Sequence, residues 1–299
     1  FAIANITIIG WLIAMEKTVR VFFIQLIVNV INLSLNLFLV LILDYGVEGI
    51  AYATLTAEVF GFFLSLILCK GVLKVEGYFV IQKIFNWDKW INLFSLNFNI
   101  FLRSLLLEVV FLSFFFWGAS FGTVVLAANQ ILIQFLHIFA YGLDGFAFSA
   151  EVLVGTSYGR KNLTDLRKSL ILCTKWAGFS ALGLSVIFFF SGSFFVQLMT
   201  TSDEVVATAQ NYLLWITLAP ICSFLAYILD GVFFGSTHTM DMRKAMIIAT
   251  SFYFFTAVIL TEVYQNHGLW LSLTLFSLIR ALTLLYYYPK IERSVSSIR

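Results

Sequence analysis

The stretch VFFIQLIVNVINLSLNLFLVLIL (residues 21–43) runs for 23 positions without a charged side chain. A helix needs about 20 apolar residues to cross a bilayer core about 30 Å thick. Residues 176–202 and 205–229 form runs of 27 and 25 residues with the same character. These runs are continuous and do not alternate with period two, which argues against a β-barrel. The sequence therefore predicts an all-α polytopic membrane protein.

The composition of the chain excludes several other classes of protein. Of its 299 residues, 61% are hydrophobic and 11% are charged, whereas a soluble domain has about 25% charged residues. Three cysteines, an odd number, do not fit a disulfide scaffold. A net charge of +2 gives no reason to expect a nucleic-acid partner. No P-loop, GxSxG, HExxH or CxxC motif occurs, so we expect neither ATP hydrolysis nor a bound cofactor.

The apolar runs predict eight complete helical spans. The opening FAIANITIIGWLIAM (residues 1–15) is apolar from its first residue and lacks an initiator Met. We expect residues 1–14 to be the second half of a further helix whose start precedes the chain, which gives about 8.5 spans. The complete spans are expected near residues 21–43, 49–69, 92–117, 122–151, 170–192, 205–234, 244–262 and 266–288.

The distribution of Lys and Arg supports this number of spans. Alternate connections, together with the C-terminal tail, contain 15 of the 18 basic residues. The other connections (residues 44–48, 118–121, 193–204 and 263–265) contain none. Because cytoplasmic loops are enriched in Lys and Arg, we expect the basic side, including the C-terminus, to be cytoplasmic.

A weak internal repeat suggests two lobes. GVEGIAYATLTAE (residues 46–58) is echoed by NHGLWLSLTLFSL (residues 266–278), 220 positions later and in the same orientation. This indicates a parallel repeat about an axis along the membrane normal. We therefore expect residues 1–70 to end one lobe and residues 92–299 to form a second lobe of six helices. The linker, residues 71–91, is either an amphipathic segment on the inner membrane surface or a plain solvated loop.

Ionisable residues occur inside the predicted spans. Each costs about 2.5–3.5 kcal/mol at mid-bilayer on insertion scales, and such residues usually face a partner or a cavity. We expect Arg103 to pair with either Asp144 or Asp230. Among these ionisable residues are Glu58, Arg103, Glu108, Asp144, Glu151, Asp230 and Arg280.

The span 122–151 has a polar stripe on one helical face. We interpret this stripe as the wall of a water-filled cavity, and the alternative is interhelical hydrogen bonding that holds the bundle together. For Glu151, a solvated position near the cytoplasmic surface is the preferred explanation. The stripe consists of Gln130, Gln134, His137, Tyr141, Asp144 and Glu151.

A second stripe lies on the span 205–234, where Ser223, Tyr227 and Asp230 share a face. Pro220 precedes them on the same side. It frees a backbone carbonyl and is expected to kink the helix. A functional hinge at Pro220 and a purely structural bend are equally supported by the sequence.

Five stretches of the chain carry a family resemblance: NFNIFLRSLLLE (97–108), VLAANQILIQF (125–135), AYGLDGFAFSAE (140–151) with VGTSYGRKN (154–162), YILDGVFFGSTHTMDMRKAM (227–246) and NHGLWLSLTLFSLIRALTL (266–284). They resemble the multidrug and toxic compound extrusion (MATE) family, most closely its DinF type. Members of this family have twelve helices in two lobes, with both termini in the cytoplasm. The resemblance implies a MATE-like helical bundle, of which about 8.5 helices are present here and the N-terminal ones are missing.

The resemblance also implies a function. It predicts a secondary active transporter in the bacterial inner membrane that exports amphiphilic or cationic small molecules. The exported molecule would be exchanged for H⁺ or Na⁺ by alternating access, and no other cofactor is expected. The protein would be a monomer in the lipid bilayer. A lipid-intermediate flippase is the alternative, and an intramembrane enzyme built around His137 is a third reading.

Site residues transfer unevenly from the family. Proton-coupled relatives have fifth- and sixth-helix positions that fall on Asn32, Asn36 and Thr54, and Glu58 could replace the Asp that often stands at Asn36. The sodium-site acids of other relatives have no match, because Glu108 and Asp230 are out of register. From the sequence alone, Pro220 is the candidate hinge. The predicted cavity residues are Asn32, Asn36, Thr54, Glu58, Arg103, Glu108, Gln134, Tyr141, Asp144, Tyr227, Asp230 and Arg280.

Overall fold

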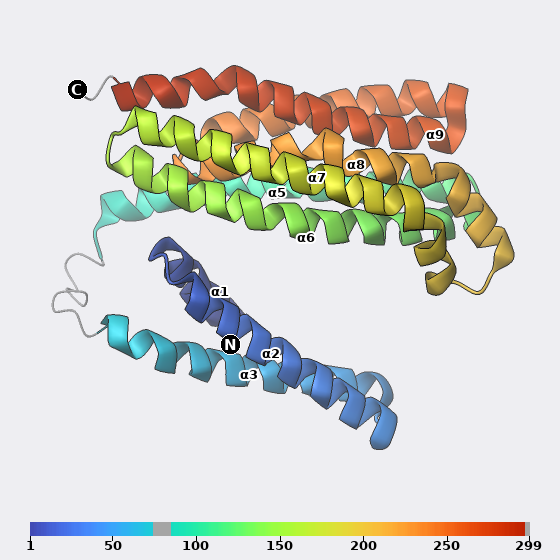
Figure 1. Ribbon diagram of the computed structural model, residues 1–299, viewed down its shortest axis with the longest axis horizontal. Coiled ribbons are helices and arrows are strands. Elements are labelled where there is room, and N and C mark those ends of the chain that lie inside the picture. The colour runs from blue at the N-terminus through green and yellow to red at the C-terminus, as the bar shows by residue number, and fades with distance from the viewer. Residues whose placement is uncertain (74–84, 297–299) are drawn as a thin grey trace. The chain divides into compact units, whose positions relative to one another are not determined.

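The computed structural model describes residues 1–73 and 85–296, and in these ranges it contains helices and no strand. The chain divides into two compact units, Phe1–Trp87 and Asp88–Arg299 (Figure 1). Most of the predicted linker, residues 74–84, lies outside the described residues.

The first unit contains α1 (Ala2–Ala14), α2 (Thr18–Asn36), the π-helix η1 (Leu37–Ile42) and α3 (Gly46–Leu73). The second unit is built from α5 (Trp87–Ser120), α6 (Thr123–Gly159), α7 (Leu163–Met199), α8 (Asp203–Gly235) and α9 (Thr239–Ser296).

Seven of the described helices are long and apolar enough to cross a membrane, and α1 is a shorter apolar helix. The last of the seven, α9, has 58 residues. It would be about 87 Å long if straight, at 1.5 Å per residue. Its backbone breaks at Gln265 (φ 50°, ψ −129°), so α9 consists of two arms. These arms match the predicted spans 244–262 and 266–288, and the prediction of an all-α polytopic membrane protein is confirmed.

The two arms of α9 pack closely against each other at a glycine. A methyl group at Gly268 would collide with the backbone carbonyl of Leu260. The backbones of the arms therefore approach more closely than any other residue at this position allows.

The first unit has a small core with a few buried polar contacts. Leu12 and Ile24 are fully buried in it. The hydroxyl of Ser65 donates a 2.6 Å hydrogen bond to Oδ1 of Asn5, which joins α3 to α1. A Cβ at Gly61 would lie 2.6 Å from a methyl group of Val28, so α2 and α3 also pack closely here.

The core of the second unit consists of two hydrophobic clusters. One includes Phe114, Phe139, Trp270 and Phe276, and the other includes Ala150, Val154, Phe233 and Leu284. Both α6 and the second arm of α9 contribute residues to the two clusters. Asp144 on α6 and Arg280 on α9 lie between the residues that belong to the first cluster and those that belong to the second. The ionisable groups thus form a charged layer between the two apolar clusters.

Two glycines place α8 directly against α6. A Cβ at Gly231 would collide with the carbonyl of Ala147, and one at Gly235 would collide with the carbonyl of Glu151. Their spacing is the small-xxx-small pattern that lets membrane helices approach closely. Asp230, adjacent to Gly231, is consequently held beside α6 in the charged layer.

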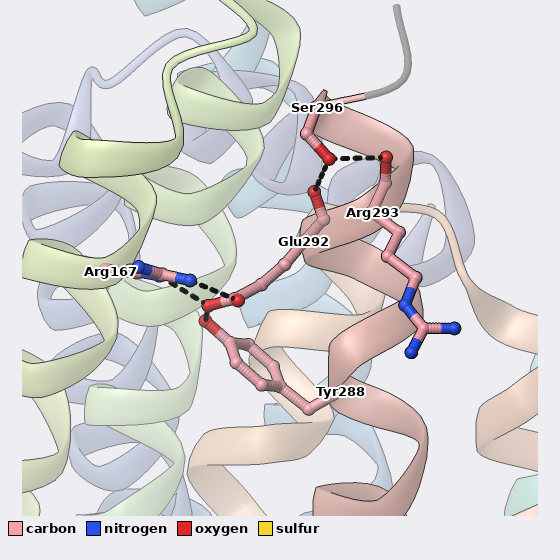
Figure 2. A network of polar contacts seen from close by, with 5 residues as sticks. All are labelled: Arg167, Tyr288, Glu292, Arg293 and Ser296. Atoms are coloured by element: carbon pink, nitrogen blue, oxygen red, sulfur yellow. Dashed lines mark hydrogen bonds and ion pairs between the residues drawn. The ribbon is translucent and has the colours of Figure 1, made fainter.

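An exposed ion pair joins the beginning of α7 to the end of α9 (Figure 2). Nε and Nη2 of Arg167 donate to the two carboxylate oxygens of Glu292 at 2.8 and 2.6 Å. The hydroxyl of Tyr288 donates to the same carboxylate at 2.9 Å. Because the Arg167 side chain is 56% exposed, we expect this network to orient the helix end and to add little stability.

Candidate functional site

A buried ion cluster lies at the centre of the second unit. Nη2 of Arg103, on α5, donates to Oδ2 of Asp230 on α8. Arg280, on α9, forms an ion pair with the same oxygen. Asp230 and Arg280 are each only 4% exposed. Arg103 thus pairs with one of the two acids expected from the sequence, whereas the second arginine on this carboxylate was not anticipated.

Aromatic rings from α8 cover both guanidinium groups. The Arg280 guanidinium lies 5.6 Å from the ring centroid of Tyr227, and that of Arg103 lies 5.9 Å from the centroid of Phe234. A ring face attracts a cation electrostatically, and more strongly where water is excluded. One face of α8 therefore supplies both the counterion, Asp230, and the aromatic partners of the cluster.

One cavity, which we call the α5–α6 cavity, has a volume of about 480 Å³. This lies in the usual range for small-molecule sites, about 300–1,000 Å³. Its apolar wall consists mainly of Leu, Phe and Ala side chains. Its polar and charged lining residues are Arg103, Glu108, His137, Tyr141, Asp144, Tyr227 and Arg280.

A second cavity of about 460 Å³, the α6–α8 cavity, lies next to the first. Asp230, Glu151 and Phe234 contribute to its lining. Arg103, Asp144 and Tyr227 line both cavities. These three side chains therefore form a wall that the two cavities share.

The predicted polar stripe of α6 coincides with the cavities over only part of its length. His137, Tyr141 and Asp144 line the α5–α6 cavity, and Glu151 lines the α6–α8 cavity. Gln130 and Gln134 are exposed and line neither cavity. Tyr141 is itself 75% exposed. Asp144 is half-buried and, among the described residues, forms no direct ion pair.

Pro220 lies inside α8, which continues as one helix from Asp203 to Gly235. Its side chain is buried. A small cavity of about 40 Å³ is lined by the nearby residues Ala219, Cys222 and Ser223 and also by Arg280. The hinge at Pro220 stays a prediction.

The polar residues predicted in the first unit lie together. The side-chain amide of Asn36 donates to Oδ1 of Asn32 at 2.7 Å, and that of Asn32 donates to the hydroxyl of Thr54 at 3.4 Å. Thr54 and Glu58 both line a further cavity of about 570 Å³ in this unit. Asn32 and Thr54 thus connect α2 to α3, and Glu58 lies one turn further along the same face of α3.

A polar network that the sequence analysis missed joins α6 to the second arm of α9. The amides of Asn129 and Asn266 exchange hydrogen bonds of 2.8 and 3.0 Å. The indole of Trp270 donates to Oδ1 of Asn129 at 2.9 Å. All three side chains are buried. The available signal was an asparagine inside an apolar helix, since such a residue needs a partner on another helix.

Comparison with known proteins identifies relatives of the chain. Residues 100–261 match the family model MatE. DNA damage-inducible protein F of Escherichia coli is 32% identical over 284 residues, which is 95% of this chain and 62% of the relative. Protein DETOXIFICATION 44, chloroplastic, of Arabidopsis thaliana is 24% identical over 253 residues, or 84% of this chain and 47% of the relative. The chain therefore spans less than two thirds of the length of these relatives.

Solved structures with the same fold include two MATE proteins. A MATE structure in the straight conformation has a TM-score of 0.89 at 15% identity, covering 98% of this chain and 67% of that one. The Vibrio cholerae MATE transporter VcmN in the bent form has a TM-score of 0.79 at 18% identity, covering 92% of this chain and 62% of that one. These likenesses show a shared fold. Since the family model covers more than half of the sequence, the chain belongs to the MatE family.

Proposed function

We propose that the protein acts as a secondary active efflux transporter in the bacterial inner membrane. It exports amphiphilic or cationic small molecules in exchange for H⁺ or Na⁺ by alternating access. The observation that carries this proposal is the layer of ionisable side chains on the two cavities of the second unit. Charges inside membrane helices are costly, and they are typical of ion and substrate pathways.

Relatives support the class of cargo. One is named multidrug and toxin extrusion protein 2, from Mus musculus, and is 23% identical over 191 residues, which cover 61% of this chain and 32% of the relative. The Arabidopsis relatives are named DETOXIFICATION. A cavity of about 480 Å³ with a mainly apolar wall suits molecules of this kind.

Asp144 is the carboxylate best placed to exchange a proton for cargo. It lines both cavities and forms no direct ion pair among the described residues, whereas Asp230 is held by two arginines. Adding a proton to Asp144 changes the charge of the cavity by one. A ligand or ion shifts a conformational equilibrium only through its different affinities for the two states, and this charge change supplies such a difference.

The first unit contains a second candidate for ion exchange. Glu58 lies one helical turn from Thr54, which is hydrogen-bonded to Asn32. Both Glu58 and Thr54 line the cavity of this unit. We propose that Glu58, together with Thr54 and Asn32, binds the coupling ion.

Transport in proteoliposomes tests the proposal. The protein is reconstituted into vesicles that contain either a pH-sensitive or a sodium-sensitive dye, and a cationic aromatic drug is added with the corresponding proton or sodium gradient imposed. We expect the drug to drive a flux of one of these ions, and Asp144→Asn to lose that flux. Asp203→Asn, which changes an exposed acid at the beginning of α8, is the matched control.

Absence of drug-driven flux under both gradients would refute ion exchange. Wild-type flux in Asp144→Asn would refute the role of Asp144 alone. The proposed topology is tested separately, with a reporter fused to the C-terminus that is active only in the cytoplasm.

A further inference from the structure

Contacts between helix ends form one surface of the second unit, which we call the basic end (residues 158–168, 236–244 and 288–296). The hydroxyl of Ser294, near the end of α9, donates to the hydroxyl of Tyr158, near the end of α6, at 3.1 Å. The ring centroid of Tyr158 lies 5.8 Å from that of His238, in the turn before α9. The ion pair of Figure 2 adds the beginning of α7. Side chains from all these segments therefore share one end of the unit.

The basic end contains eight Lys and Arg residues and three acids, and each of the three acids already has a partner. Asp241 accepts from Nζ of Lys290 at 2.7 Å. Asp165 accepts from the side-chain amide of Asn162 at 2.7 Å. Glu292 is held by the ion pair of Figure 2. No acid of the basic end is therefore left to pair with its remaining cations.

Six cations of the basic end have no ion pair or hydrogen bond within the part of the chain that the structure describes. All of them except Arg243 are exposed. Figure 2 shows one of them, Arg293, extending away from the network around Glu292. A cluster of one sign of charge attracts ligands of the opposite sign, so this end favours an anionic partner. The six are Arg160, Lys161, Lys168, Arg243, Lys244 and Arg293.

Exposed aromatic and apolar side chains adjoin these cations on α9. Tyr286, which is 78% exposed, lies seven residues before Arg293 and on the same helical face. Met240, which is 54% exposed, lies four residues before Lys244. Aromatic rings beside Lys and Arg are typical of the level at which a membrane meets water. This combination favours a lipid headgroup over a soluble anion.

The first half of α7 has the same arrangement. Lys168 and Lys175 are seven residues apart, so they share a helical face, and both are exposed. Trp176, which follows Lys175, is also exposed. A lysine inside a membrane span lays its apolar stem along the acyl chains and places its ammonium group at the interface. Both lysines of α7 are thus suited to contact headgroups.

We propose that the basic end of the second unit binds the headgroups of anionic phospholipids. The unpaired Lys and Arg side chains hold the phosphate groups. The rings of Tyr286 and Trp176 lie where the headgroups meet the acyl chains. Each cation near a negatively charged membrane surface strengthens binding about fivefold. This inference goes beyond the proposed transport function and does not depend on it.

Competition between two lipids in a reconstituted bilayer tests this inference. Phosphatidylglycerol, which is anionic, and phosphatidylcholine, which has no net charge, are mixed with brominated acyl chains on one of them. Bromine quenches the fluorescence of nearby tryptophans, and the measurement is repeated with bromine on the other lipid. At an ionic strength of 0.1 M we expect phosphatidylglycerol to be enriched around the protein about fivefold. At 1 M, where the screening length falls from about 10 Å to about 3 Å, we expect less than about twofold enrichment.

A neutral variant and a charge-conserving variant locate the binding surface. Both change the five exposed cations of the basic end that have no partner. The control exchanges Arg for Lys and Lys for Arg at these positions, so it keeps every charge. We expect the neutral variant to lose the enrichment and the control to keep it. The substitutions of the neutral variant are Arg160→Gln, Lys161→Gln, Lys168→Gln, Lys244→Gln and Arg293→Gln.

The inference fails if the wild-type protein shows no preference for phosphatidylglycerol, a result that requires no variant to fold. It also fails if the preference persists unchanged at 1 M salt, or if the neutral variant retains it. Loss of the preference in the charge-conserving variant as well would overturn its assignment to these charges. Because no gradient or drug is present, none of these outcomes depends on whether the protein exchanges ions.

Discussion

Gly231 on α8 lies against the backbone carbonyl of Ala147 on α6, so closely that no side chain fits between the two helices. This contact places the neighbouring Asp230 in the charged layer of the second unit. The position of the ion cluster thus depends on a residue that has no side chain.

Gly231→Ala is expected to destabilise the protein by about 1–3 kcal/mol, because the added methyl forces the two backbones apart. Thermal unfolding in detergent measures the loss. Gly145→Ala is the matched control, since a Cβ at Gly145 meets nothing within 4 Å. There we expect unchanged or slightly greater stability, as alanine is the better helix former by about 1 kcal/mol. Equal melting temperatures for both variants would contradict the close contact.

Asp230→Asn is expected to be more destabilising than Asp144→Asn. Removing the charge of Asp230 leaves two buried guanidinium groups without their shared counterion, and breaking a buried pair costs about 3–5 kcal/mol. Asp144 forms no direct ion pair among the described residues, so its amide variant should fold almost normally. Unfolding midpoints of the two variants, measured side by side, test this order. A stable Asp230→Asn protein beside an unstable Asp144→Asn protein would reverse the assignment.

Asn129→Leu is expected to destabilise the second unit by about 1–3 kcal/mol for each buried polar partner that it leaves unsatisfied. Asn266 and Trp270 both lose their bonds to Asn129 in this variant. Adding Asn266→Leu removes one orphaned amide, so the double variant should recover part of the stability. Gln134→Leu, at an exposed position of the same helix, serves as the control. Additive effects of the two asparagine substitutions would argue against the reciprocal pair.

Glu58→Gln is expected to abolish or strongly reduce drug-driven ion exchange while leaving the unfolding midpoint of the protein almost unchanged. The side chain lines the cavity of the first unit, so the substitution removes a carboxylate from that cavity with little change in side-chain size. Glu48→Gln, at an exposed position near the beginning of the same helix, is the matched control. Drug-driven ion flux in proteoliposomes measures the difference, and normal flux in Glu58→Gln would exclude this acid as a coupling group.

The sequence predicted the spans well because their length and hydropathy are local properties. Even the break in α9 at Gln265 falls between two predicted spans, at a turn without Lys or Arg. The π-helical segment Leu37–Ile42 was not predicted, because an apolar run fixes the length of a span and carries no information on its hydrogen-bond period.

The candidate site was predicted only in part. The helical repeat placed Asp144 and Tyr141 on one face, but Gln134 on the same stripe is exposed and lines neither cavity of the second unit. The helical repeat predicts which residues share a face of a helix. How much of that face is covered depends on the neighbouring helices, which the repeat does not predict. Arg103 and Arg280 can share the carboxylate of Asp230 only because α5, α8 and α9 meet at that residue. Such a meeting is set by distant contacts that no local pattern encodes.

Arg103, Asp144 and Tyr227 border both chambers of the second unit. A molecule lodged in one chamber consequently alters the boundary of the other, so the two cannot fill independently. Titration with a small probe should then depart from a simple hyperbola, and saturating one compartment should change the dissociation rate from its neighbour.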